Sequence, residues 1–259
     1  MSVFPPLFPL PRIADLTLMT DTVRLAKHIA DTTGCSRREA EQLIEGGWVR
    51  VDGKVVEEAG FRMTPGQQTE IDPNAKPVPV DPVTILWNKP AGFDVSGNSD
   101  PALHKLTPDT RQPSDRSNVR FLRKHLSNLE LVTPIDAAAS GLVVLTQEFR
   151  IARKLRDDAP RIEHEYLVEV AGDIAPDGMT RLNAGGFYKG KAVPAAKISW
   201  QNETRLRVAI KTPPEGLIEH LCTQVGLKVR AIKRLRIGRL PVAGLEPGQW
   251  RYLLGYERF

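Results

Sequence analysis

The sequence contains little cysteine and no long hydrophobic run. Its two cysteines, Cys35 and Cys222, lie far apart in a chain of 259 residues, outside any CxxC motif and any cysteine and histidine set with zinc-ligand spacing. This pattern argues against a disulfide framework and against a zinc site. No apolar stretch approaches the roughly 20 residues that a membrane-spanning helix needs. We therefore expect a protein of the reducing cytoplasm without membrane association.

The N-terminal segment lacks the features of a secretory signal. It has no basic start, and four prolines interrupt its apolar part, MSVFPPLFPLP, so we interpret residues 1–21 as a flexible leader. The composition, 41% hydrophobic and 26% charged, is ordinary for a soluble globular protein, and the length suggests two unequal domains. The net charge of +5 permits a polyanionic partner, so the placement of the basic residues matters more than their total.

Residues 22–55 predict a small module of two helices and a hairpin. Apolar residues recur at helical spacing over 22–32, where Thr-Thr-Gly ends the pattern. A second helix is expected over 37–45, because Ser36 stands three residues before Glu39 in a capping-box pattern and a Gly-Gly pair follows. The sequence WVRVDGKVV then predicts two short strands joined by Asp-Gly, a strong hairpin signal.

Basic side chains gather in this module. Arg24 and Lys27 on the first helix can share one face with Arg37 and Arg38, where the amides of the second helix start, at Ser36, also favour phosphate oxygens. Charge by itself favours an ordinary solvated face. However, RLAKHIA, CSRREAEQLIEGGWVRVDGKVV and PGQQTEID resemble the small RNA-binding module, the αL motif, shared by ribosomal small-subunit protein four and many RNA-modifying enzymes. The resemblance covers residues 22–72 and implies RNA binding.

A proline-rich linker is expected over residues 73–82, and a second domain over 83–259. A long loop is predicted over 96–118, and NVRFLRKHL then predicts a short helix that carries the basic residues Arg120, Arg123 and Lys124. Strand-like segments outnumber helical ones over the rest of the chain. We therefore predict an α+β fold with a mixed, mainly antiparallel sheet.

One strand-like segment, VRAIKRLRIG, is strongly basic. It carries Lys233, Arg234 and Arg236, which we consider a second candidate surface for an RNA backbone. The alternative is an edge strand that positive charge protects from pairing with other chains.

A single acid stands at the mouth of an apolar strand in LVTPIDAAASGLVVLT. An unpaired carboxylate is costly to bury, so Asp136 needs either a partner or a chemical task. The small residues at 137–141 would let an RNA backbone approach this carboxylate closely.

The order of NKPAG, PIDAAASGLVVLT, EHEYLVEV and EGLIEHL resembles the ribosomal pseudouridine synthases of the small-subunit synthase A family, over about residues 22–256. These enzymes isomerise a uridine of ribosomal RNA: the glycosidic bond is cut, the base turns, and it is rejoined through carbon five. The resemblance implies ribosomal RNA or a pre-ribosomal particle as partner, a monomeric protein, and no metal or organic cofactor.

The resemblance also implies roles for individual residues. Asp136 matches the family's essential aspartate, which adds to the sugar or base or takes a proton from the sugar. Tyr166 matches the tyrosine that stacks on the flipped base and is a candidate to remove the carbon-five proton, although without the motif it would be interpreted as a core residue. Lys89-Pro90 matches an architectural turn. Ile218 and Leu221 match the positions that line the base pocket.

Two positions depart from the family pattern. Pro134 replaces an arginine associated with filling the gap that the extruded base leaves, and Glu219 aligns with the arginine that pairs with the aspartate. Glu219 beside Asp136 would repel it, so the carboxylate would need another cation, and we consider Arg230 and Arg205 as candidates.

Two hypotheses follow. The preferred one is an active ribosomal pseudouridine synthase. The other is an RNA-binding relative that has lost catalysis and acts in ribosome assembly. A generic DNA binder has only the charge in its favour.

Overall fold

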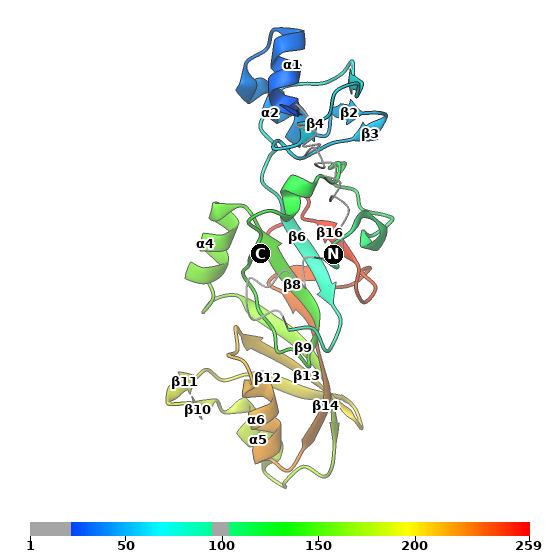
Figure 1. Cartoon of the computed structure of the whole chain (residues 1–259). Helices are drawn as coiled ribbons and strands as arrows, with labels where there is room; N and C mark the ends of the chain where they lie inside the picture. Colours follow the sequence, from blue (N-terminus) through cyan, green and yellow to red (C-terminus); the bar gives the residue numbers. More distant parts are fainter. Residues whose placement is uncertain (1–21, 95–103) are drawn as a thin grey trace, which may run out of the picture. The chain divides into compact units, whose positions relative to one another are not determined.

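The structure, a computed structural model, describes residues 22–94 and 104–259. The expected leader at 1–21 and residues 96–103 of the expected loop lie outside the described residues. The chain divides into two compact units, Met1–Pro79 and Val80–Phe259 (Figure 1).

The first unit contains two helices and short antiparallel strands. The second helix starts where the sequence predicts, because Ser36 accepts a hydrogen bond from the Glu39 amide while the Glu39 side chain accepts one from the Ser36 amide, which completes the capping box. The first helix starts at Leu25 and not at residue 22, so Arg24 lies just before it. Asp52 and Gly53 both have positive φ, the geometry that favours Asp-Gly in a tight hairpin. The elements are β1 (Val23–Arg24), α1 (Leu25–Thr33), α2 (Arg37–Glu45), β2 (Val49–Val51), β3 (Lys54–Val55), β4 (Arg62–Met63) and β5 (Thr69–Ile71).

The second unit is built on one mixed sheet with the strand order β12-β13-β9-β14-β8-β6-β16. Along this path only the β14 and β8 pair is parallel, which confirms the predicted α+β fold with a mainly antiparallel sheet. The strands are β6 (Thr84–Lys89), β8 (Ser140–Thr146), β9 (Glu163–Ala171), β12 (Lys197–Asn202), β13 (Arg205–Lys211), β14 (Lys228–Ile237) and β16 (Trp250–Tyr252). Two short strands pair with interior strands off this path, β7 (Glu130–Leu131) with β8 and β15 (Leu240–Pro241) with β14.

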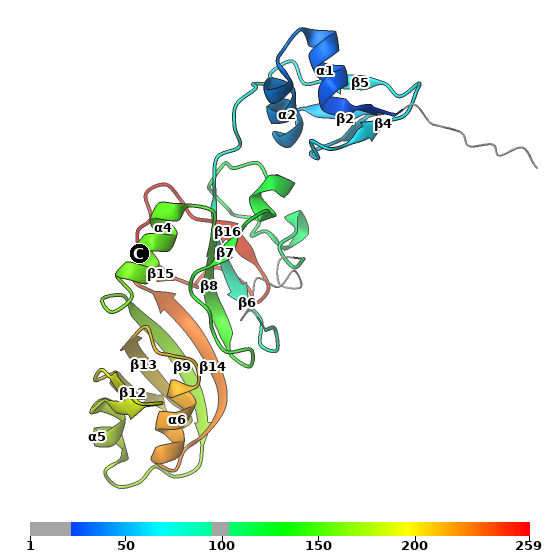
Figure 2. The same cartoon turned by 60° about the vertical axis from the view of Figure 1, so that its left-hand side comes forward.

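Helices cover the sheet in separate places. Helix α6 (Leu217–Gln224) packs against β14, α5 (Gly178–Asn183) against β12, and α4 (Phe149–Asp157) against β8 (Figure 2). Strands β6 and β8 are buried along nearly their whole length, with one hydrophobic cluster on each face of the sheet, which explains their continuous apolar sequences.

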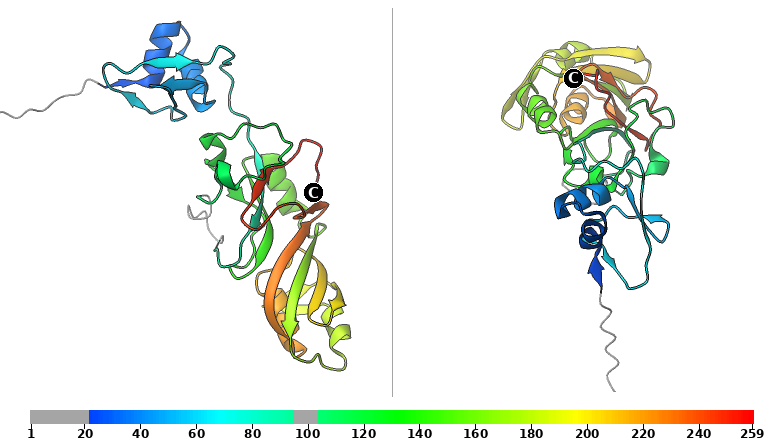
Figure 3. Two further views of the ribbon diagram at one scale, coloured as in Figure 1. Left: turned by 90° about the vertical axis from the view of Figure 1, so that its right-hand side faces the viewer. Right: turned by 90° about the horizontal axis from the view of Figure 1, so that it is seen from above.

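Two expectations about local structure are wrong. The segment 118–126 forms only the single 3-10 turn η2 (Arg123–Leu126), because Arg111 donates to the Val119 carbonyl and Leu122 is extended. The basic strand β14 is not an edge strand, since it runs in the interior of the sheet between β9 and β8. Figure 3 shows β14 and β9 as long neighbouring strands. Within the described residues, no helix has the length and apolar character needed to cross a membrane.

Candidate active site

Asp136 lies in the turn that enters β8, half-buried, with its carbonyl accepting from the Ala139 amide at 3.0 Å. Gly141, the last of the small residues that follow, has a structural reason that does not involve RNA. Gly141 has φ +112°, and a Cβ there would come within 2.2 Å of the Arg234 carbonyl oxygen, so only glycine lets β8 approach β14 this closely.

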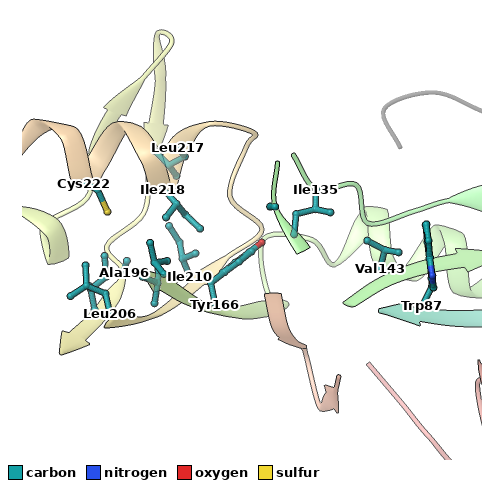
Figure 4. Close-up of a cluster of buried hydrophobic side chains, with 14 of the residues drawn as sticks. Trp87, Ile135, Val143, Tyr166, Ala196, Leu206, Ile210, Leu217, Ile218 and Cys222 are labelled. Atoms are coloured by element: carbon teal, nitrogen blue, oxygen red, sulfur yellow. The ribbon is translucent and has the colours of Figure 1, made fainter. Parts of the chain in front are cut away.

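Tyr166 shares a pocket with Asp136. It projects from β9, and Figure 4 shows its hydroxyl directed toward Ile135. The side chain is buried, and burial raises the pKa of its phenol, so the hydroxyl is protonated at neutral pH. The pocket has about 320 Å³ of empty space, including the part open to solvent, and is lined by Pro134, Ile135, Asp136, Tyr166, Pro213, Pro214, Glu215, Ile218 and Ile232.

A backbone amide, and not an ion-pair partner, donates directly to the Asp136 carboxylate, and the charge of Lys89 also interacts with it. Gly216, the N-cap of α6, donates its N–H to Asp136 Oδ2 at 3.3 Å, at the helix end where amides and the helix dipole favour an anion. In the part of the chain that the structure describes, no lysine, arginine or histidine nitrogen forms an ion pair with Asp136. Neither arginine considered above takes that role, since Arg205 pairs with Glu169 at 3.4 Å and Arg230 is exposed.

The structure also does not place the Glu219 carboxylate where it would repel Asp136. Glu219 is exposed on α6 and does not line the pocket, whereas the backbone of Gly216 faces Asp136. Ile218 lines the pocket. Leu221 does not, because it is half-buried and packs against the hydrophobic core one turn further along the helix.

The prediction that Arg234 contacts an RNA backbone is wrong. Arg234 is 1% exposed, so it cannot contact an RNA backbone. Its guanidinium donates to the carbonyl oxygens of Thr133 at 2.5 Å, Pro134 at 3.0 Å and Leu142 at 2.6 Å. Because those carbonyls lie on both sides of Asp136, Arg234 ties the turn that carries the carboxylate to strand β8.

Lys89, which the sequence predicts only as part of an architectural turn, is a second buried cation. It is fully buried, and its Nζ donates to the carbonyls of Phe93 at 2.8 Å and Ala137 at 3.1 Å. Burial, and then the charge of Arg234, lowers its pKa to about 8, while Asp94 and Asp136 oppose the shift. A lysine at the end of a continuous apolar strand was the available signal in the sequence.

The remaining basic candidates are distributed over both units. In the first unit Arg24, Lys27, Ser36, Arg37 and Arg38 are all exposed, with the Ser36 hydroxyl engaged in the helix cap. In the second unit Arg120 and Lys124 are exposed and Lys233 is half-buried. Arg236 is half-buried and pairs with Glu163 at 2.8 Å and Glu165 at 2.9 Å, which neutralises much of its charge.

Comparison with known proteins matches a different family model to each of the two units. The family model for RNA pseudouridylate synthase matches residues 83–208, and the S4 domain model matches residues 23–68. The chain is 30% identical over 240 residues to ribosomal large subunit pseudouridine synthase B of Bacillus subtilis (strain 168), covering 90% of this chain and 93% of that protein. It is 27% identical over 245 residues to the dual-specificity RNA pseudouridine synthase RluF of Escherichia coli (strain K12), covering 93% of this chain and 78% of that protein.

A solved structure shares the fold. The crystal structure of a pseudouridylate synthase superposes with a TM-score of 0.56 at 20% sequence identity, covering 89% of this chain and 96% of that chain.

Proposed function

Because the chain belongs to the RNA pseudouridylate synthase family, we propose that it isomerises a specific uridine of ribosomal RNA to pseudouridine with Asp136 as the essential carboxylate. One observation carries the residue assignment. Asp136 and Tyr166 line the same pocket, and an amide at the start of a helix supports the carboxylate. That arrangement suits a carboxylate that must stay ionised in a place with little water.

The chemistry assigns different tasks to the two side chains. The carboxylate of Asp136 acts where the glycosidic bond breaks, next to the sugar or the base. The Tyr166 ring offers an apolar face on which the uracil can stack, with Ile218 and Ile232 as further apolar walls. To reach this pocket the target nucleotide must leave its stack, which costs a few kcal/mol.

The proposal also covers how the protein binds RNA and where it acts. The first unit matches the S4 domain, and its exposed Arg24, Lys27, Arg37 and Arg38 supply the charge that phosphate contacts need. We propose that these residues contact ribosomal RNA or a pre-ribosomal particle, with Ser36 of the first unit and Arg120, Lys124 and Lys233 of the second unit as further contacts. We also propose that the protein works as a monomer in ribosome biogenesis in the cytoplasm.

The test is conversion of uridine to pseudouridine in ribosomal RNA. RNA from cells that lack the gene should carry one or a few unmodified positions, and adding back the wild-type gene should restore them. The Asp136→Asn variant keeps the size of the side chain and should restore none. Full restoration by that variant would contradict the role of Asp136.

A second candidate function, RNA binding without catalysis in ribosome assembly, has one observation in its favour: within the described residues Asp136 has no ion-pair partner. It predicts salt-sensitive RNA binding and no pseudouridine in any RNA tested. Turnover at one site by the wild-type protein excludes it.

A further inference from the structure

A small solvent-exposed hairpin outside the main sheet contacts the residues beside the amide that donates to Asp136. Its strands are β10 (Gly186–Tyr188) and β11 (Lys191–Val193), joined by a turn in which Lys189 and Gly190 both have positive φ. The two strands form their own sheet and pair only with each other within the described residues. Figure 1 shows the hairpin beside α5 and α6.

One side of the hairpin packs on the candidate active site. The Tyr188 hydroxyl donates to the Glu215 carbonyl at 3.1 Å, and its ring lies 5.0 Å from the His220 ring on α6. The same hydroxyl abuts Gly216, where an added Cβ would lie 2.6 Å from it. Gly216 in turn donates to Asp136. Tyr188 therefore touches the two residues that set the position of the amide supporting the carboxylate.

The hairpin also offers an aromatic ring and positive charge to solvent. Phe187 is 79% exposed, the largest exposed fraction among the exposed large apolar side chains that the structure describes. Lys189 and Lys191 are exposed as well, and neither has an acidic partner among the described residues. The sequence from 178 to 202 contains four basic residues, Arg181, Lys189, Lys191 and Lys197, and no acidic one.

An exposed aromatic ring with neighbouring cations is the combination that binds single-stranded nucleic acid, because bases stack on the ring while the cations contact phosphates. The charge excludes a cationic partner. Phe187 is the one large apolar side chain with a high exposed fraction in the described hairpin, which disfavours a protein partner that would bury a large apolar surface. An unpaired stretch of RNA fits both the ring and the charge.

We propose that the β10–β11 hairpin binds an unpaired nucleotide next to the target uridine through Phe187, Lys189 and Lys191, and that Tyr188, as a positioning residue, thereby holds Gly216 against Asp136. Phe187 and Tyr188 point to opposite sides of their strand, whereas both lysines lie on the Tyr188 side. Lys189 Nζ is 5.0 Å from the centroid of the Tyr188 ring, and Lys191 is the cross-strand partner of Tyr188, so a phosphate bound by these lysines would lie beside Tyr188. This inference rests on the proposed function for its substrate, but its binding step does not depend on catalysis.

The binding step is tested with a short labelled oligouridylate and the full chain. Phe187→Ala should weaken binding at least about 5-fold, the low end of the effect of removing one stacked aromatic side chain. Phe149→Ala is the matched control, because Phe149 is also a highly exposed phenylalanine, 71% exposed, but lies on α4. Equal affinity of the two variants would overturn the proposed binding site.

The positioning step is tested with Tyr188→Phe, which removes the hydroxyl and keeps the ring on His220. We expect unchanged affinity for oligouridylate. Hydrogen exchange of the Gly216 amide should slow when the wild-type protein binds RNA, and slow clearly less in the variant. With ribosomal RNA as substrate, the single-turnover rate at saturating RNA should fall about 10-fold, as expected when one supporting hydrogen bond is weakened.

The outcomes separate this inference from the proposed function. Gly216 exchange that responds to RNA equally in the wild-type protein and Tyr188→Phe would overturn the positioning role. A wild-type protein that makes no pseudouridine would contradict the proposed function, whereas the binding and exchange measurements would still decide the role of the hairpin.

Discussion

Replacing Arg234 with methionine should destabilise the Val80–Phe259 unit strongly and inactivate the site. The guanidinium donates to three carbonyl oxygens, of Thr133, Pro134 and Leu142. Pro134 is exposed and its carbonyl can bond water instead, but Thr133 and Leu142 are buried. Each unsatisfied buried acceptor costs about 1–3 kcal/mol, and removing the buried charge returns part of that cost. We therefore expect the free energy of unfolding to fall by about 2–4 kcal/mol.

The matched control is Arg205→Met. Arg205 pairs with Glu169 at 3.4 Å, and both side chains are 46% exposed, so the loss should be about 0–1 kcal/mol. Urea unfolding followed by tryptophan fluorescence reports on this unit, because Trp87 and Trp250 are fully buried in it. If Arg234→Met were no less stable than Arg205→Met, Arg234 would not be the residue that ties the Asp136 turn to the sheet.

Three further predictions concern charge. The double variant Arg37→Glu and Arg38→Glu should weaken RNA binding by about 10-fold or more in low salt, with a shallower salt dependence, as measured by filter binding; unchanged affinity would remove these two exposed arginines from the interface. The pKa of Lys89 is lowered to about 8, so the unfolded state binds more protons between about pH 8 and 10.5, and the free energy of unfolding should rise with pH across that window. In Lys89→Met that component of the slope should disappear in urea unfolding curves measured at several pH values. Burial lowers the pKa of His125 to about 4, and its ring nitrogen lies 2.7 Å from the Tyr252 hydroxyl, so its contribution to stability is present above about pH 6.5 and is lost as pH falls toward 4. His125→Gln should flatten the acid side of the stability curve, and an unchanged acid side would show that His125 is not the group that titrates.

Local elements were predictable because their causes are local. The capping box of Ser36 and Glu39 and the Asp-Gly turn at 52–53 depend on hydrogen bonds and dihedral angles within a few residues. The sheet type followed from the excess of strand-like segments over helical ones. The helix expected at 118–126 does not form, because Arg111 donates a tertiary hydrogen bond to the Val119 carbonyl and the backbone at Leu122 is extended. A local sequence pattern does not predict such a bond.

The candidate site was predictable in part. Motif order singled out Asp136, Tyr166 and Ile218, and all three line one pocket. Leu221 was misplaced because a motif match does not specify which side of a helix faces the pocket.

The sequence alone singled out the carboxylate and the ring that we propose for the site, because their types and neighbours carry the family pattern. Only the tertiary structure decided how the carboxylate is supported. Arg234 reads as one more cation in a basic strand, and its burial follows from the position of β14 inside the sheet. The donor to Asp136 is a backbone amide, Gly216, eighty positions away along the chain. Nearly every residue has a backbone amide, so no residue type in the sequence predicts which amide will donate to Asp136. Only the packing of α6 brings the Gly216 amide to the carboxylate.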